Sequence, residues 1–168
     1  MQATLKLEPT YYQAALKFTE DLSEAYRKRG RTDHFYGQGA PTSEAANLRG
    51  SVAEAGLCQY LGIPYEPEVM DADGGDGGVD VEWRGLSIQV KATLHERGGL
   101  IYDDPKLVRA DLTVLTVLYT HKTQRIAGWI SSPEYLRLAY WREFERGKKL
   151  YLPQAKLRPM QEFSLKAA

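Results

Sequence analysis

The sequence contains a single cysteine and no apolar run approaching the roughly 18 residues that cross a membrane. One cysteine, Cys58, excludes a disulfide framework, and with three histidines at unrelated spacings it argues against a zinc site. Charged residues follow Met1 closely, at Lys6 and Glu8, where a secretory leader would be apolar. We therefore expect no membrane segment, no leader, and a reducing cytoplasmic location, or the host cytoplasm if the gene belongs to a phage.

The chain also lacks a net charge, because 22 Lys and Arg balance 22 Asp and Glu. A neutral total excludes recognition of nucleic acid by bulk positive charge. The charge is unevenly distributed, however: seven acids and no base lie between Glu66 and Glu82, and basic segments flank this stretch. Any electrostatic contribution to function must therefore come from local clusters.

A hydrophobic content of 43% over 168 residues predicts one folded domain. Periodicity and capping predict helices over residues 11–28, from 42 or 43 to about 61, and from 133 to about 145. Strands are expected at 66–70, 79–83, 86–92, 112–119 and 125–130, with an edge strand at 149–152. This order predicts an α/β fold with a mixed central β-sheet flanked by helices.

A hairpin with Arg84-Gly85 as its turn places the polar residues of two strands opposite one another. In this register Val81 faces Ile88 on an apolar face, while Asp80 faces Gln89 on a polar face that Lys91 continues. Opposed Cβ atoms lie about 5 Å apart, so a carboxylate, an amide oxygen and an ammonium are expected together. Carboxylate and amide oxygens form half of a site for a hard cation such as Mg²⁺.

A second acid for such a site is expected on the preceding helix. Glu54 has no base three or four residues away, and small residues such as Gly50 and Ser51 surround it in the sequence. An unpaired acid on an apolar helix face needs a metal or a hydrogen-bond donor unless it lies exposed at the rim of the helix. Glu44 is an alternative on the same helix.

The combination of Glu54, a glycine-rich loop into Gly78-Val79-Asp80-Val81, and Ile88-Gln89-Val90-Lys91 resembles the PD-(D/E)xK nuclease superfamily. The form Gly-Gly-Asp-Gly-Gly-Val-Asp…Gln-Val-Lys is similar to its Mrr-type, Holliday-junction-resolvase-like branch. The motif resemblance covers residues 50–91, and the order of elements agrees with that core to about residue 131. It implies a restriction-endonuclease-like fold, with a single domain over 1–168 made of an N-terminal helix (11–28), a motif core (44–131) and a C-terminal helix and tail (132–168).

The resemblance also implies a Mg²⁺-dependent DNA endonuclease in which Mn²⁺ can substitute. Asp80 would bind the ion directly, Glu54 directly or through water, and the Gln89 side chain and the Val90 carbonyl would be further ligands. Lys91 would orient the attacking water and stabilise charge in the transition state. Gln89 departs from the Glu or Asp that is commonest in the superfamily, which removes one negative charge and should weaken cation affinity.

Partners follow from the same resemblance. DNA is the expected substrate, with phosphate contacts assigned to Arg27, Lys28, Arg29, Arg31, Lys148 and Lys149. Cutting two strands suggests a homodimer. The alternative function is a non-catalytic nucleic-acid-binding or assembly module that retains a degenerate nuclease fold. A calcium loop within residues 71–82 is disfavoured, because Gly75 and Asp76 do not match the pattern of an EF-hand.

Overall fold

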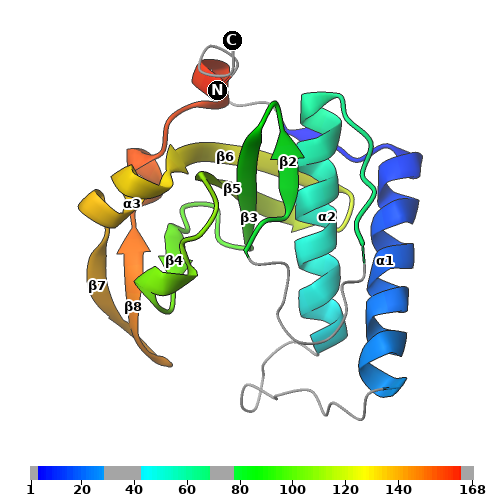
Figure 1. Ribbon diagram of the computed structural model, residues 1–168, viewed down its shortest axis with the longest axis horizontal. Helices are drawn as coiled ribbons and strands as arrows, with labels where there is room; N and C mark the ends of the chain where they lie inside the picture. Colours follow the sequence, from blue (N-terminus) through cyan, green and yellow to red (C-terminus); the bar gives the residue numbers. More distant parts are fainter. Residues whose placement is uncertain (1–3, 29–42, 69–77, 164–168) are drawn as a thin grey trace.

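The computed structural model describes residues 4–28, 43–68 and 78–163. Its centre is a five-stranded, curled mixed sheet in the order β1-β6-β5-β3-β2 (Figure 1). The strands are β1 (Leu5–Lys6), β2 (Val81–Trp83), β3 (Leu86–Thr93), β5 (Leu112–Thr120) and β6 (Thr123–Ser131). The β3 and β5 strands pair in parallel, and the other neighbours are antiparallel. The predicted α/β class with a mixed central sheet is confirmed.

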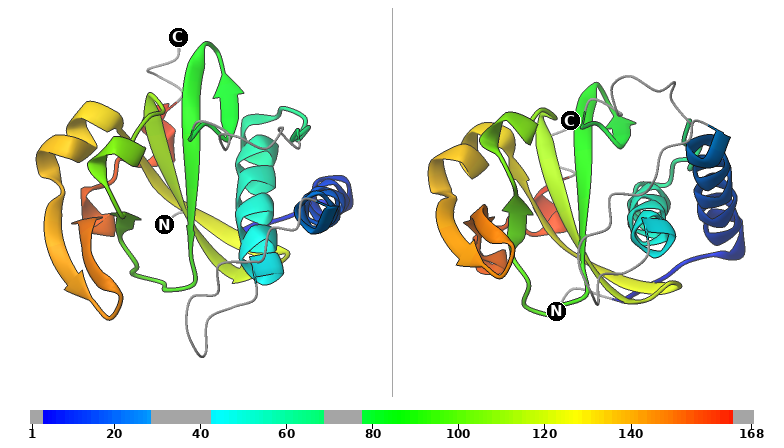
Figure 2. Two further views of the ribbon diagram at one scale, coloured as in Figure 1. Left: turned by 60° about the horizontal axis from the view of Figure 1, so that its bottom comes forward. Right: turned by 90° about the horizontal axis from the view of Figure 1, so that it is seen from below.

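Two long helices cover one face of this sheet, with α2 between α1 and the strands (Figure 2). The α1 helix (Pro9–Lys28) begins two residues before the predicted helix, with a proline in its first turn, where its missing N–H has no helical partner to lose. The α2 helix (Ser43–Leu61) has the predicted extent and is followed by Gly62, whose φ of +69° suits glycine. Thr19 Oγ1 of α1 lies 3.3 Å from Ser51 Oγ of α2 in a buried contact.

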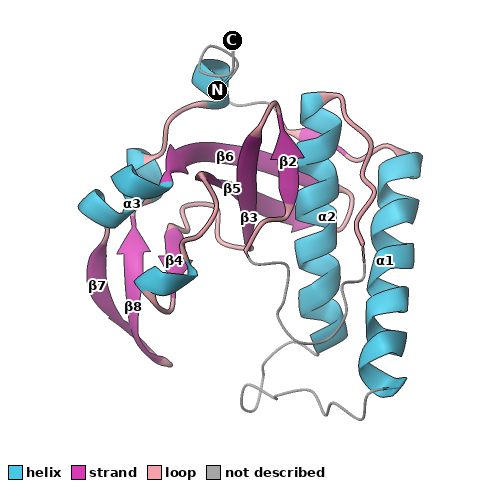
Figure 3. Cartoon of the chain, in the orientation of Figure 1, coloured by secondary structure: helices cyan, strands magenta, loops and turns pink. Residues whose placement is uncertain are grey.

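The opposite face of the central sheet carries a second sheet, in the order β4-β8-β7, and the short helix α3 (Figure 3). These elements are β4 (Leu100–Tyr102), α3 (Ser132–Leu138), β7 (Tyr140–Phe144) and β8 (Gly147–Leu152). Two hydrophobic clusters result. One joins α2 to the central sheet through residues such as Leu57, Ile88 and Val114, and the other joins the two sheets through residues such as Leu115 and Leu152.

The predicted helix from 133 to about 145 is wrong beyond Leu138. Ala139 has an extended backbone, and the aromatic-rich segment after it pairs with β8 as β7. Gly147, with φ of +89°, closes this hairpin, and Tyr135 Oη donates a 2.7 Å hydrogen bond to the Leu150 carbonyl. Residues 149–152 are correspondingly not an edge strand but part of the central strand of the second sheet.

Two further strand predictions need correction. Residues 66–68 are irregular, and the rest of the predicted strand 66–70 lies outside the described residues. The β2 strand begins at Val81 and not at Val79, because the Asp80 side chain occupies part of the ladder, as described below. Arg84 and Gly85 have φ values of +50° and +76°, so the predicted two-residue turn is confirmed, and so is the register of residues 81–83 opposite 86–88. The expected pairing of Asp80 with Gln89 does not form, because the Asp80 N–H donates to the Ile88 carbonyl and its carboxylate accepts the Val90 N–H.

No helix within residues 4–28, 43–68 and 78–163 is long and apolar enough to cross a membrane.

The position of α2 on the sheet depends on Gly56. A Cβ atom at Gly56 would lie 1.5 Å from Gln124 Nε2, which donates a 3.0 Å hydrogen bond to the carbonyl of Val52. We expect Gly56→Ala to lower the free energy of unfolding by about 1–3 kcal/mol, since buried Gln124 must leave this acceptor. In the double variant with Gln124→Ala the clash is gone, and urea unfolding should show a loss smaller than the sum of the two single losses. Additive losses would contradict this account.

Candidate active site on β3

Asp80 extends the β2–β3 ladder with its side chain. Its backbone N–H donates to the Ile88 carbonyl at 2.9 Å, and its Oδ2 accepts the Val90 N–H at 2.6 Å. The carboxylate therefore lies beside the backbone of β3 at the point where β2 begins. A charged acceptor makes this hydrogen bond short and strong, so the orientation of Asp80 is well determined.

The main-chain carbonyl of Val90 lies on the same side of β3 as Asp80. In a β-strand the N–H and C=O of one residue point to the same neighbouring strand, and the Val90 N–H points to Asp80. The paired residues of β2 and β3 end at Val81 and Ile88, so Val90 lies beyond the ladder. A carboxylate and a main-chain oxygen are thus directed to the same edge of β3.

Gln89 is held by a hydrogen-bond chain that the sequence did not predict. Tyr102 Oη donates to Gln89 Oε1 at 2.6 Å and lies 2.7 Å from Thr113 Oγ1. Because a phenol has one proton, the Thr113 hydroxyl must be the donor to Tyr102. Burial raises the pKa of Tyr102 to about 12, with the charge of Asp80 as a smaller contribution in the same direction. The phenol therefore stays protonated near neutral pH and fixes the Gln89 oxygen.

Lys91 is next to the same tyrosine. Its Nζ lies 4.8 Å from the centroid of the Tyr102 ring, a cation–π contact. Gln89 and Lys91 alternate with Ile88 and Val90 along β3, and the latter pair packs in the cluster under α2. The structure thus brings Asp80, Val90, Gln89 and Lys91 together, with Tyr102 contacting two of them.

Glu54 lies on α2, which covers the other face of β3. The Tyr65 hydroxyl donates to Glu54 Oε2 at 2.9 Å, so this acid has the hydrogen-bond donor that its half-buried position requires. Burial and then the Glu54 charge raise the pKa of Tyr65 and raise that of Cys58 to about 12. Its Oε1 lies beside Gly50, which lines a pocket together with Lys91. Glu54 is therefore at the border of that pocket, whereas Glu44 is exposed in the first turn of α2.

The oxygen atoms of Asp80, Gln89 and Val90 are of the chemical types that a hard cation binds. Mg²⁺ prefers oxygen ligands and keeps several waters, so a carboxylate, an amide oxygen and a main-chain carbonyl are chemically adequate. Within the described residues, no group of three or more His, Cys, Asp and Glu side chains is arranged to hold a metal ion. Three acids of the negative segment, Asp71, Asp73 and Asp76, lie outside the described residues.

The basic residues assigned to DNA lie at two ends of the molecule (Figures 1 and 2). Arg27 and Lys28 end α1, where Lys28 Nζ is 2.7 Å from Glu24. Lys148 and Lys149 are on β8 at the other end, and Lys149 pairs with Asp103. Arg29 and Arg31 lie outside the described residues. In Figure 1 the β2–β3 hairpin lies between α1 and β8.

Sequence reasoning missed Tyr102, Thr113 and Tyr65 as parts of this site. Thr113 was expected only as part of a buried strand, and it lies opposite Gln89 in the parallel register. Tyr102 belongs to a three-residue strand that pairs with Leu150, so no local pattern identifies it. The only local signal is the pair Gly98-Gly99 ahead of Leu100-Ile101-Tyr102.

No protein-family model matches the sequence, and searches of curated proteins and of solved structures find no match either.

Replacing Tyr102 by phenylalanine tests the hydrogen-bond chain. Tyr102→Phe leaves Gln89 Oε1 and buried Thr113 without this partner, so the free energy of unfolding should fall by about 1–3 kcal/mol. Tyr135→Phe, which removes a buried hydroxyl bonded to the Leu150 carbonyl, is the matched control. Urea unfolding should show similar losses at pH 7.

The pH dependence of the unfolding free energy distinguishes Tyr102→Phe from the wild type. Because folding raises the pKa of Tyr102 from 10.0 to about 12, its stabilising contribution is complete below pH 10 and is lost as the pH rises towards 12. The decrease in unfolding free energy from pH 9.5 to 11.5 should therefore be smaller in Tyr102→Phe than in the wild type. An equal decrease in Tyr102→Phe and in the wild type would contradict the raised pKa of Tyr102.

Proposed function

We propose that the protein is a metal-dependent DNA endonuclease with a restriction-endonuclease-like core. The observation that carries this proposal is that Asp80 contacts the Val90 N–H beside β3, while Gln89 and Lys91 of the same strand both contact Tyr102. The arrangement of α2 packed on a β2–β3 hairpin, with β5 parallel to β3, also supports it.

A Mg²⁺ ion at this edge would activate water as a nucleophile and screen the negative charge of the phosphate. Asp80 supplies its charged ligand, and Val90 and Gln89 supply neutral oxygens. Glu54 contributes from the α2 side through water. The Val90 N–H and the Tyr102 hydroxyl are positioning groups, since each fixes the direction of a ligand oxygen before the ion arrives.

Lys91 has the role of the catalytic cation. Its contact with the Tyr102 ring keeps the ammonium close to Gln89, and no acid among residues 4–28, 43–68 and 78–163 forms an ion pair with it. The ammonium is thus available to orient water and to stabilise negative charge on the phosphate oxygens in the transition state. Tyr102 acts through both neighbours and does not itself contact substrate.

One observation favours the alternative of a binding module without catalysis. Gln89 brings no charge, and its oxygen already accepts a hydrogen bond from the Tyr102 hydroxyl, so the site holds a cation less strongly than one with a second carboxylate.

The proposal extends to a homodimer, because two sites are needed to cut both strands of a duplex. The exposed Tyr140 and Trp141 on edge strand β7 are the surface that we assign to it.

Removing the ligand or the catalytic cation should abolish cleavage. Asp80→Asn and Lys91→Ala are expected to lower the rate of DNA hydrolysis in Mg²⁺ about 10²–10⁴-fold. The matched controls are Asp21→Asn and Lys17→Ala, which break only an exposed ion pair of α1 and should cleave as the wild type does. The measurement is a gel assay on supercoiled, linear, single-stranded and branched DNA.

Two outcomes would count against the proposal. Cleavage that persists undiminished in Asp80→Asn and Lys91→Ala would remove the site assignment. A wild-type protein that leaves all four DNA forms intact in Mg²⁺ and in Mn²⁺ would leave the non-catalytic module as the function.

Restoring a carboxylate should strengthen the site. Gln89→Glu keeps an oxygen that accepts from Tyr102 and adds one negative charge beside Asp80, so half-maximal activity should require about tenfold less Mg²⁺. Gln161→Glu adds the same charge on an exposed residue far along the chain and is the control. An unchanged Mg²⁺ requirement in Gln89→Glu would show that this side chain does not face the ion.

A further inference from the structure

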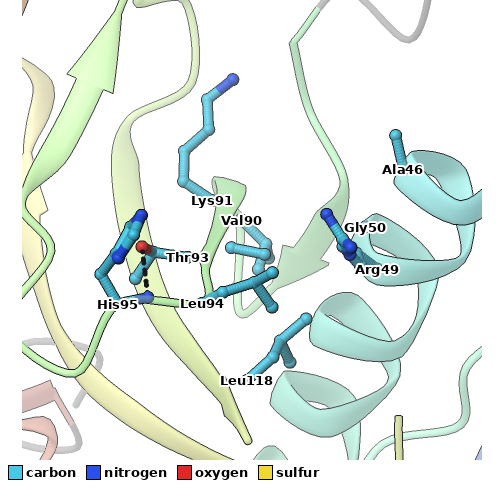
Figure 4. Close-up of a pocket in the computed structure, with 10 residues that line it drawn as sticks. Ala46, Arg49, Gly50, Val90, Lys91, Thr93, Leu94, His95 and Leu118 are labelled. Atoms are coloured by element: carbon cyan, nitrogen blue, oxygen red, sulfur yellow. Dashed lines mark hydrogen bonds between the residues drawn. The ribbon is translucent and has the colours of Figure 1, made fainter. Parts of the chain in front are cut away.

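Two adjoining pockets form a groove at the carboxyl ends of β3 and β5, beside the N-terminal half of α2 (Figure 4). Their volumes are about 500 and 300 Å³, and they share Arg49, Leu94 and Leu118. Because β3 and β5 are parallel, their carboxyl ends meet at one edge of the sheet, a common location for ligand sites in α/β proteins. Lys91 lines the groove at the end nearest the candidate active site.

The ionisable side chains that line this groove are all basic: Lys91, His95, Arg49 and His121. Figure 4 shows Arg49 on the α2 wall and His95 on the strand side, while the Lys91 side chain starts on the strand side and points away from Arg49 and Leu118. No described residue lining either pocket is an acid. Two acids lie near the lining. Glu54, at the border of the first pocket, accepts a hydrogen bond from the Tyr65 hydroxyl, and Glu96, next to His95 in the sequence, is paired with Arg125 at 2.9 Å. The groove therefore suits an anionic ligand.

The floor and rim of the groove are apolar. Val90, Leu94 and Leu118 form the floor in Figure 4, and Tyr119 lines the second pocket. Leu94 and Tyr119 are 53% and 46% exposed, high values for large apolar side chains. A phosphate ion alone would gain nothing from such a floor, whereas a ligand with both negative charges and flat apolar faces would use the cations and the floor.

We infer that this groove binds a single-stranded segment of DNA that leads away from the cleavage site. The inference rests on the proposed function and specifies its substrate: DNA with unpaired nucleotides next to the scissile bond. Arg49 contacts the phosphate backbone, and Tyr119 stacks on a base. In a duplex the bases are stacked on one another and cannot reach an apolar floor, so the groove discriminates in favour of unpaired strands.

Binding measured in EDTA tests the groove without cleavage. Fluorescence anisotropy of the whole protein with labelled oligo-dT of about 12 nucleotides should give at least tenfold tighter binding than with a blunt hairpin duplex of equal length. Arg49→Ala should weaken oligo-dT binding severalfold and reduce the slope of log K against log salt by about 0.7. Lys17→Ala, which removes an exposed cation of α1, should change neither value.

A second pair of variants tests stacking. Tyr119→Ala should weaken oligo-dT binding about fivefold or more, because a base loses its aromatic partner. Tyr119→Phe keeps the ring and loses only the hydroxyl to which Arg125 Nε donates at 3.2 Å, so it should bind as the wild type does. Thermal unfolding of each variant verifies that the fold is intact.

The results separate this inference from the proposed function. Equal affinity for oligo-dT and duplex, or equal affinity of Arg49→Ala and Lys17→Ala for oligo-dT, would overturn the inference that the groove binds single strands, even if the protein cleaves DNA. Preference for oligo-dT that depends on Arg49 and Tyr119 would establish the groove even if no cleavage occurs.

Discussion

The alternation of side chains along β3 is the constraint on which the rest of the structure depends. Successive residues of a strand point to opposite faces, so Ile88 and Val90 are buried under α2 while Gln89 and Lys91 point to Tyr102. A shift of one residue would bury Lys91 among apolar side chains and expose Ile88. The hydrophobic core and the candidate site therefore fix the same register.

Asp80 links the strand register of β3 to the position of the oxygen atoms in the candidate site. By accepting the Val90 N–H, its carboxylate replaces a main-chain partner in the ladder, so β2 begins at Val81, two residues later than predicted. The same hydrogen bond directs the Val90 N–H and carbonyl to the side on which the carboxylate lies. A local interruption of the sheet is thus what brings two oxygen donors to one edge.

The second sheet contributes through Tyr102. This residue is 2% exposed, packs against Tyr135 at 5.1 Å between ring centroids, and carries the hydrogen bond to Gln89. The β4–β8–β7 sheet is therefore more than an appendage of the central one, since its packing determines where the Gln89 oxygen and the Lys91 ammonium lie. The restriction-endonuclease-like proposal rests on the β2–β3 hairpin, and this sheet supplies the residue that holds its side chains.

The elements predicted well are those whose signal is local. The Arg84-Gly85 turn, the hairpin register and the end of α2 at Gly62 each follow from glycine conformation and short-range alternation. The helix predicted to reach about residue 145 ends at Leu138, because pairing of Tyr140–Phe144 with β8 prevails over a local pattern that fits a helix. Helix propensity depends on nearby residues only, so it carries no information about a partner strand that comes later in the chain.

The sequence by itself determined the two-residue turn and the alternation that puts Gln89 and Lys91 on one face of β3, and it predicted the residues of the candidate site. Alternation and a two-residue turn suffice for that, since they act over a few residues. Only the tertiary structure decided what holds these groups. Tyr102 reaches Gln89 from β4, Tyr65 holds Glu54 beside the groove, and Arg49 meets the ends of β3 and β5 from α2. These contacts join segments that are distant in the chain, and packing alone brings them together.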